Sequence, residues 1–134
     1  MHLYNQNLFK GVLLDSQKKA IIVGYILQGK TEKALSLLSK MYSISVPKVK
    51  IGLPKGYRGK TSACYSPGKA TIFLLNYEKL TDSFTLLHEF YHHLRTSIDQ
   101  KHKGTEKYAN QFAREFIDAY KSVKERELTN DKRL

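Results

Sequence analysis

The stretch that most constrains the fold lies near the middle of the chain: residues 86–95 read LLHEFYHHLR, with three histidines and one glutamate inside six positions. Side chains four positions apart lie on one face of an α-helix, about 5–6 Å from each other. His88 and His92 have this spacing, so on a helix their imidazoles can converge on one metal ion. The stretch therefore predicts a partly buried helix that carries a metal site. The alternative is a pair of buried, hydrogen-bonded histidines without an ion.

The glutamate and the last histidine of this stretch have different expected roles. Glu89 can reach a water molecule at the metal, act as a general base and pass the proton to a leaving amine. His93 lies about 100° around the helix from His92, so it cannot share the ion and is expected to pack or to form hydrogen bonds elsewhere. Glu89 is therefore the expected catalytic residue, and His93 is left out of the metal site.

A catalytic zinc site needs a third protein ligand, for which the sequence offers several candidates. The position where the metzincin pattern has its third histidine is Ile98, which cannot bind a metal. Asp99 and His102 both follow the motif closely in the chain. Glu106 is favoured, because Asn110 lies four residues later on the same helix face and can orient a histidine ligand. A glutamate in the first turn is also favoured by the helix dipole alone, so the alternatives stay open.

The motif helix and the following helix, which begins near Glu106, together resemble the ImmA/IrrE-type metallopeptidases. The pattern of that family is HExxH followed by a helix with E-x-x-A-N/D-x-F-A. Here TLLHEFYHHL precedes EKYANQFAREFI, and the matching positions of the second helix are Glu106, Ala109, Asn110, Phe112 and Ala113. The resemblance covers about residues 62–117. It implies a zincin-like, gluzincin-type core in which one zinc ion is held by His88, His92 and Glu106, with Glu89 as base and Asn110 orienting a ligand.

Hydrophobic periodicity and turn residues predict a single α+β domain over residues 1–134. Its expected parts are a helical N-terminal part, a part with a small sheet and two active-site helices, and a frayed charged tail: 1–45, 46–126 and 127–134. Helices are expected at 15–28, 31–42, 82–97 and 105–126. Asp15 and Ser16 can cap the first of these helices, and Gly29 marks its stop. Thr81 or Asp82 can cap the third. Strands are expected at 49–51 and in a hairpin with its turn at 66–69 and its second strand at 70–75.

Charge and composition narrow the partners and the compartment. The formal net charge is +11, and residues 33–77 contain eight Lys or Arg but no Asp or Glu. This segment favours an acidic part of a protein or a nucleic acid as partner, although a solvated basic face is the alternative. The chain has one cysteine, no recognisable secretory signal and no apolar run long enough to span a bilayer. We expect a cytoplasmic protein without a membrane partner.

The resemblance also implies a narrow-specificity endopeptidase that acts on a regulatory protein such as a repressor. In zinc peptidases an extended substrate commonly pairs with an edge strand, and strand 70–75 is the expected edge because it directly precedes the motif helix. Tyr65, His102 and Tyr108 are candidate donors to the oxyanion of the reaction. Cys64 is expected to be a small buried side chain rather than a ligand.

Two other functions stay open. One is a DNA-associated protease that resembles the SprT-like group, with His102 as the third ligand and the basic segment 33–77 on DNA. The other is a non-catalytic module that binds nucleic acid or protein and carries a vestigial HExxH. Glu89 argues against the second function, because a purely structural metal site does not need a base.

Overall fold

The computed structural model describes residues 2–57, 59, 61–99 and 105–133, with the backbone alone for 2–14 and 131–133. Within these residues the helices are α1 His2–Leu27, α2 Thr31–Tyr42, α3 Ser83–Ile98 and α4 Glu106–Arg133. The strands are β1 Lys48–Ile51, β2 Ala63–Ser66 and β3 Thr71–Leu74. Two short 3-10 helices follow β2 and β3: η1 Pro67–Lys69 and η2 Tyr77–Thr81. The α+β class expected from the sequence is confirmed.

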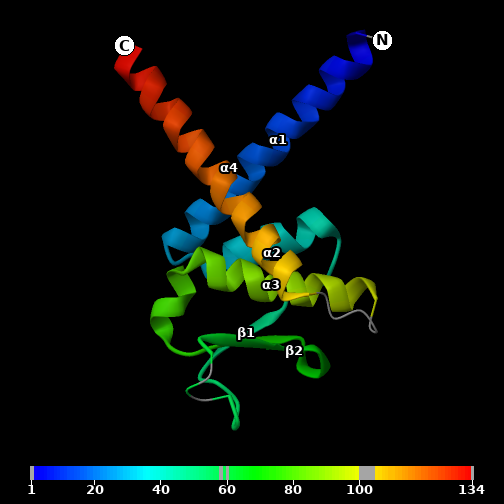
Figure 1. Cartoon of the computed structure of the whole chain (residues 1–134), viewed down its shortest axis with the longest axis vertical. Coiled ribbons are helices and arrows are strands. Elements are labelled where there is room, and N and C mark those ends of the chain that lie inside the picture. The colour runs from blue at the N-terminus through cyan, green and yellow to red at the C-terminus, as the bar shows by residue number, and fades with distance from the viewer. Residues whose placement is uncertain (1, 58, 60, 100–104, 134) are drawn as a thin grey trace.

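The elements are stacked, with the sheet at one end and the crossing helices α1 and α4 at the other (Figure 1). α3 lies over the sheet, between the strands and α4. The N-terminal half of α1 and the C-terminal half of α4 extend away from the body as two arms. None of the helices in the described part of the chain is both long and apolar enough to cross a membrane.

The sheet has the strand order β1-β3-β2, with β1 parallel and β2 antiparallel to β3. The predicted hairpin is confirmed, since β2 and β3 pair across a turn that includes η1. The prediction that strand 70–75 forms an edge of the sheet is wrong. β3 is the central strand and is buried along its whole length, because β1 pairs with the side that the hairpin leaves open. β2 is consequently the edge strand nearest to α3 and α4.

The first helix begins much earlier than the predicted start at residue 15. Asp15 was expected to help cap this helix, but it lies within α1 and forms an ion pair with Lys19 one turn later, at 3.1 Å. The predicted stop is correct, because Gly29 adopts φ 77° and its N–H donates to the carbonyl of Ile26 at 3.0 Å. A left-handed residue just after the last turn is a common helix ending that glycine adopts without a steric penalty.

The C-terminal residues are also more ordered than the sequence pattern indicated. α4 continues to Arg133, so the prediction of a frayed tail over 127–134 is wrong for the residues described, 127–133. Four of the seven residues in this segment have high helix propensity: Glu127, Leu128, Lys132 and Arg133. An ion pair between Lys124 and Glu127, 3.5 Å apart, bridges the point where the helix was expected to end.

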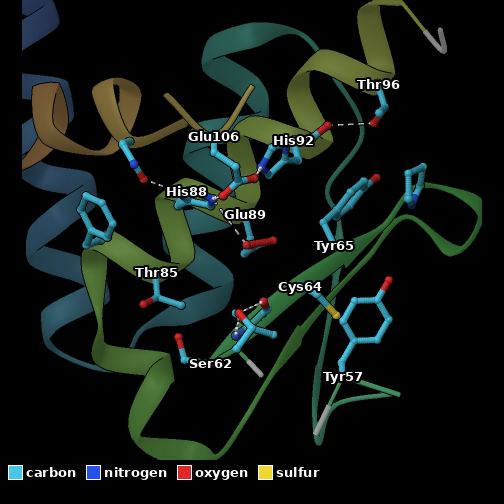
Figure 2. A pocket seen from close by; sticks show the side chains of 15 residues that line it. Tyr57, Ser62, Cys64, Tyr65, Thr85, His88, Glu89, His92, Thr96 and Glu106 are labelled. Atoms are coloured by element: carbon cyan, nitrogen blue, oxygen red, sulfur yellow. Dashed lines mark hydrogen bonds and ion pairs between the residues drawn. The ribbon is translucent and has the colours of Figure 1, made fainter. Parts of the chain in front are cut away.

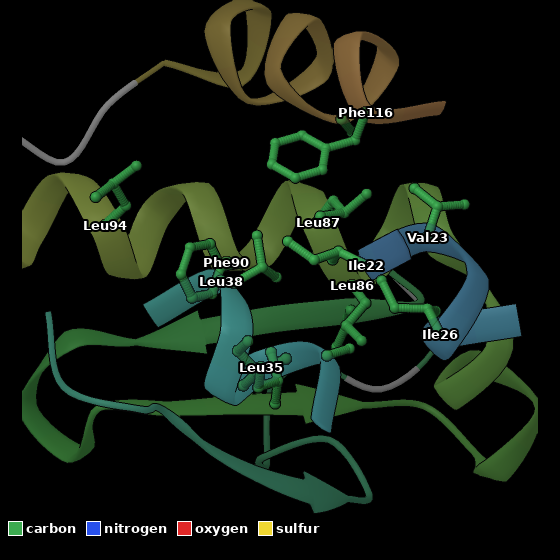
Figure 3. Close-up of a cluster of buried hydrophobic side chains, with 14 of the residues drawn as sticks. Ile22, Val23, Ile26, Leu35, Leu38, Leu86, Leu87, Phe90, Leu94 and Phe116 are labelled. Atoms are coloured by element: carbon green, nitrogen blue, oxygen red, sulfur yellow. The ribbon is translucent and has the colours of Figure 1, made fainter. Parts of the chain in front are cut away.

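The hydrophobic core lies where α1, α2, α3 and α4 meet one face of the sheet (Figure 3). Its largest side chains include Phe90 of α3 and Phe116 of α4, both fully buried. Ala109 and Ala113 of α4 are also fully buried, and their small side chains allow α4 to lie close to α3. This close contact places the first turn of α4 beside the histidine face of α3.

Candidate metal centre

The histidine-bearing helix α3 is anchored at its N-terminus by the predicted cap. The carboxylate of Asp82 accepts a hydrogen bond from the backbone N–H of Thr85 at 3.1 Å, which satisfies one of the free donors of the first turn. One turn further on, His88 and His92 lie on the same side of the helix, with ring centroids 5.2 Å apart. The helical spacing therefore brings the two imidazoles together as the sequence predicted.

Glu106, the first residue of α4, completes a three-residue cluster with these histidines (Figure 2). Its Oε2 lies 2.8 Å from Nε2 of His88, and its Oε1 lies 2.9 Å from Nε2 of His92. One ligand atom from each of the three residues lies within 4.8 Å of the others, which is close enough to hold a metal ion. Glu106, the third ligand favoured by the sequence, thus lies beside both histidines, although it belongs to α4 and they belong to α3.

Asn110 determines which nitrogen of His88 faces the cluster. Its amide Oδ1 lies 2.8 Å from Nδ1 of His88 and must accept a hydrogen bond there, so Nδ1 carries the ring hydrogen. In a neutral imidazole this leaves Nε2 with a lone pair, directed at the carboxylate of Glu106. Two lone-pair atoms at this distance require a proton or a metal ion to hold them together. Two imidazoles and one carboxylate are a donor set that suits zinc.

Glu89 is a buried carboxylate beside the cluster, with 8% of its surface exposed. Its Oε1 lies 3.8 Å from Nε2 of His88. Burial raises the pKa of Glu89, and the carboxylate of Glu106 adds to this rise, while the two histidines act in the opposite direction. A carboxylate with a raised pKa binds a proton more readily, which is the property that a general base needs.

The cluster opens into a cavity of about 790 Å³ between α3, the edge strand β2, the start of α4 and the loop before β2. This volume falls within the usual range for ligand sites. Besides the three clustered residues, Glu89 and Asn110, the lining residues are mostly aromatic, hydroxyl or small: Tyr57, Thr61, Ser62, Ala63, Cys64, Tyr65, Pro67, Phe84, Thr85 and Thr96. The cavity therefore has room for several residues of an extended chain next to the cluster.

The other candidate ligands lie outside this cluster or outside the described residues. Asp99 follows the last turn of α3 and is not part of the three-residue group. His102 lies outside the described residues. Tyr108 is about half exposed and does not line the cavity, in contrast to Tyr65. Cys64 also lines the cavity and is half-buried rather than buried, and this partial burial raises the pKa of its thiol.

His93 lies outside the metal cluster and forms hydrogen bonds elsewhere, as its position on the helix predicted. It is 1% exposed, and burial lowers the pKa of its imidazole. Its Nε2 lies 2.7 Å from the carbonyl oxygen of Ser45, and its Nδ1 lies 2.7 Å from the hydroxyl of Tyr65. This connection was not predicted from the sequence, because the three residues belong to segments that are far apart in the chain. Strand alternation alone could have placed Tyr65 on the helix-facing side of β2.

The lysines of the basic segment 33–77 are exposed wherever the structure describes them. The six described lysines between residues 33 and 77 are all exposed, and none forms an ion pair with a described acidic residue: Lys33, Lys40, Lys48, Lys50, Lys55 and Lys69. Arg58 and Lys60 lie outside the described residues.

Comparison of the chain with family models, with curated proteins and with solved structures finds no match in any of the three.

Proposed function

We propose that this protein is a zinc-dependent metallopeptidase that hydrolyses a peptide bond with water, built on a zincin-like core. The observation that carries the proposal is the convergence of His88, His92 and Glu106, whose ligand atoms lie within 4.8 Å of one another, with the buried carboxylate of Glu89 beside them. A structural zinc site commonly has four protein ligands, whereas a catalytic site commonly has three and one open position. The cavity beside the cluster is consistent with the catalytic arrangement.

Each residue of the cluster has a defined task in this proposal. His88, His92 and Glu106 would hold the ion, which when bound supplies Lewis acidity that lowers the pKa of water and polarises a peptide carbonyl. Glu89 accepts the proton of the attacking water on its carboxylate and delivers it to the nitrogen of the departing amine. Asn110 holds the ring hydrogen of His88 on Nδ1, so that Nε2 remains available as a ligand.

The edge strand β2 is the proposed support for an extended substrate. β2 pairs with β3 on one side only, and Ala63, Cys64 and Tyr65 line the cavity that contains the cluster. A peptide that adds to the free side of this strand would pass next to Glu89 and the metal ligands. This arrangement replaces the edge strand that was expected at 70–75.

The proposed substrate is an acidic segment of an intracellular regulatory protein such as a repressor, as the resemblance to the ImmA/IrrE-type enzymes implies. The support within the structure is the exposure of the six described lysines of the basic segment, none of which forms an ion pair with a described acidic residue. Positive charge of this kind attracts acidic partners over a distance and accelerates their association at low salt. Digestion of whole regulatory proteins is therefore a better assay than cleavage of a general substrate.

Zinc content provides the direct test of the metal site. We expect one zinc ion per chain after reconstitution of the purified protein, and loss of this ion in His88→Ala and Glu106→Ala. Glu127→Ala removes an exposed glutamate from the same helix as Glu106 and should keep the ion. If Glu106→Ala keeps zinc while His102→Ala loses it, the third ligand is His102 and the assignment of Glu106 is wrong.

The base is tested separately from the metal. Glu89→Gln should retain zinc, because Glu89 is not one of the three ligands, but it should lose hydrolytic activity by several orders of magnitude. A zinc-loaded Glu89→Gln variant with full biological activity would show that the protein acts as a binding module and not as a peptidase.

A further inference from the structure

A chain of two hydrogen bonds connects the backbone behind α3 to the cavity. It runs from the carbonyl oxygen of Ser45, in the segment between α2 and β1, through His93 of α3 to the hydroxyl of Tyr65 on β2, with both distances 2.7 Å. The His93 ring is buried and lies edge-on to Tyr65 and Phe90, with centroids 5.4 and 5.8 Å away. The imidazole therefore has little freedom to rotate or to exchange partners.

The direction of both hydrogen bonds follows from the chemistry of the three groups. A carbonyl oxygen only accepts, so Nε2 of His93 must carry the ring hydrogen and donate to Ser45. The Nδ1 atom of the neutral ring is then an acceptor, and the hydroxyl of Tyr65 must donate to it. The single hydrogen of this hydroxyl is consequently directed away from any molecule in the cavity.

The oxygen of Tyr65 retains lone pairs that a ligand can use. Tyr65 is half-buried and lines the same cavity as the metal cluster. The hydroxyl of Thr96, which also lines this cavity, donates to the backbone carbonyls of His92 and His93 at 2.9 and 3.2 Å. Thr96 is also a hydrogen-bond partner of the Tyr65 hydroxyl. It occupies at most one lone pair of the Tyr65 oxygen and leaves another for a ligand.

We propose that His93 is a positioning residue that holds the Tyr65 hydroxyl as a hydrogen-bond acceptor toward the cavity, where it binds a backbone N–H of the peptide substrate. This inference rests on the proposed peptidase function and adds a requirement to it. The substrate must have a free amide hydrogen at the residue that faces Tyr65, so proline or an N-methylated residue is disfavoured there. Tyr65 is accordingly a binding group in this arrangement and not the donor to the oxyanion.

The hydrogen-bond direction can be measured without any substrate. Long-range proton–nitrogen NMR of the full-length protein at about pH 8, above the usual histidine pKa of about 6.5, reports which ring nitrogen of His93 carries the hydrogen. We expect the hydrogen on Nε2, and a shift of the Nδ1 resonance in Tyr65→Phe, which removes the donated hydrogen bond. A hydrogen on Nδ1 at this pH would overturn the inference, because Tyr65 would then be free to donate into the cavity.

The requirement for an amide hydrogen can be measured with a metal-directed probe. We would compare acetyl-trialanine hydroxamate with analogues in which each alanine nitrogen is methylated in turn, all bound to the zinc-loaded protein. For one analogue, methylation should weaken binding to the wild type about two- to tenfold more than it weakens binding to Tyr65→Phe. This difference corresponds to the loss of a single hydrogen bond. Equal losses in both proteins for every analogue would overturn the inference.

Variants of His93 separate positioning from general support of the fold. His93→Gln can still donate to Ser45 through its amide nitrogen and accept from Tyr65 through its amide oxygen, so we expect it to keep the discrimination against the methylated analogue. His93→Leu should lose the discrimination, and Tyr65→Phe provides the same comparison if His93→Leu does not fold. Failure of the unmodified hydroxamate to bind the zinc-loaded wild type would refute the proposed function itself, whereas the NMR result decides the hydrogen-bond direction independently.

Discussion

Asn110 of α4 and His88 of α3 are joined by a hydrogen bond of 2.8 Å between the amide Oδ1 and the imidazole Nδ1. Residues 22 positions apart are brought together by the packing of the two helices, and the contact determines which nitrogen of His88 faces Glu106. A partner of this kind orients a metal ligand and raises its basicity. The metal site is therefore supported by side chains on both helices.

The first prediction concerns this supporting contact. Asn110→Leu removes the acceptor and should weaken zinc binding by about 10- to 100-fold, which is the usual effect of losing such a partner. Asn110→Asp keeps an acceptor at the same place and should bind zinc at least as tightly as the wild type. Competition with a chelator of known affinity measures both changes. Equal zinc affinity in the wild type and Asn110→Leu would show that the contact does not support the site.

The second prediction concerns the effect of metal on stability. Because the three ligands come from two helices, zinc binds the folded chain better than the unfolded chain and should raise its free energy of unfolding. At a free zinc concentration of about 100 times Kd the gain is about 2.7 kcal/mol. Urea unfolding with zinc and with a chelator should show this difference in the wild type and in Glu127→Ala, but not in Glu106→Ala. A similar gain in Glu106→Ala would place the zinc elsewhere.

The third prediction links the packing of α4 to the metal site. Ala113 is fully buried where α4 lies close to α3, so Ala113→Leu should force the helices apart and lower the free energy of unfolding by about 1–3 kcal/mol. It should also weaken zinc binding, because Glu106 is on the same helix two turns away. Arg114→Leu, at the next and exposed position, is the matched control and should change neither property. Calorimetry and zinc titration measure the two effects.

The fourth prediction concerns stability at high pH. Burial raises the pKa of Tyr42 from 10.0 to about 12, and the carboxylates of Asp15 and Glu115 contribute to this rise. The folded protein retains the proton of Tyr42 more strongly than the unfolded chain. The contribution of this tyrosine to the free energy of unfolding is therefore complete below pH 10 and is lost as the pH rises toward 12. Tyr42 packs against the rings of Phe90 and Phe112, so Tyr42→Phe should preserve the packing.

This prediction is checked by urea unfolding of both proteins across the alkaline range. Deprotonation of lysines affects the wild type and Tyr42→Phe alike, so the difference between the two isolates the tyrosine. The wild type should lose more stability than Tyr42→Phe above pH 10. Parallel losses in the two proteins would mean that the hydroxyl of Tyr42 ionises as easily in the folded state as in the unfolded state.

Features that depend on local periodicity were predicted well from the sequence. The spacing of His88 and His92 required a common helix face, and the one-residue offset of His93 required a different one. The cap at Asp82 and the stop at Gly29 were also recognisable, because each depends on the conformation of only a few neighbouring residues.

Features that depend on competition between segments were predicted less well. The start of α1 was misplaced, because Asp15 can serve equally as a cap or as one half of a helical ion pair with Lys19. Strand 70–75 was expected at the edge of the sheet, because no local pattern indicates that β1 pairs with it in parallel. The helix at 127–133 was missed because a charged segment is compatible with both a helix and a frayed end.

The chemical groups of the candidate site, and the helix face that carries two of them, were predictable from the order of residues in the chain. Periodicity is a property of the local backbone, so it needs no knowledge of the rest of the chain. Three-dimensional packing was needed to show that Glu106 contacts both histidines, that Asn110 orients one of them and that Tyr65 is hydrogen-bonded to His93. These contacts join residues 14 to 28 positions apart, and it is the packing of α3 against α4 and β2 that brings them within hydrogen-bond distance.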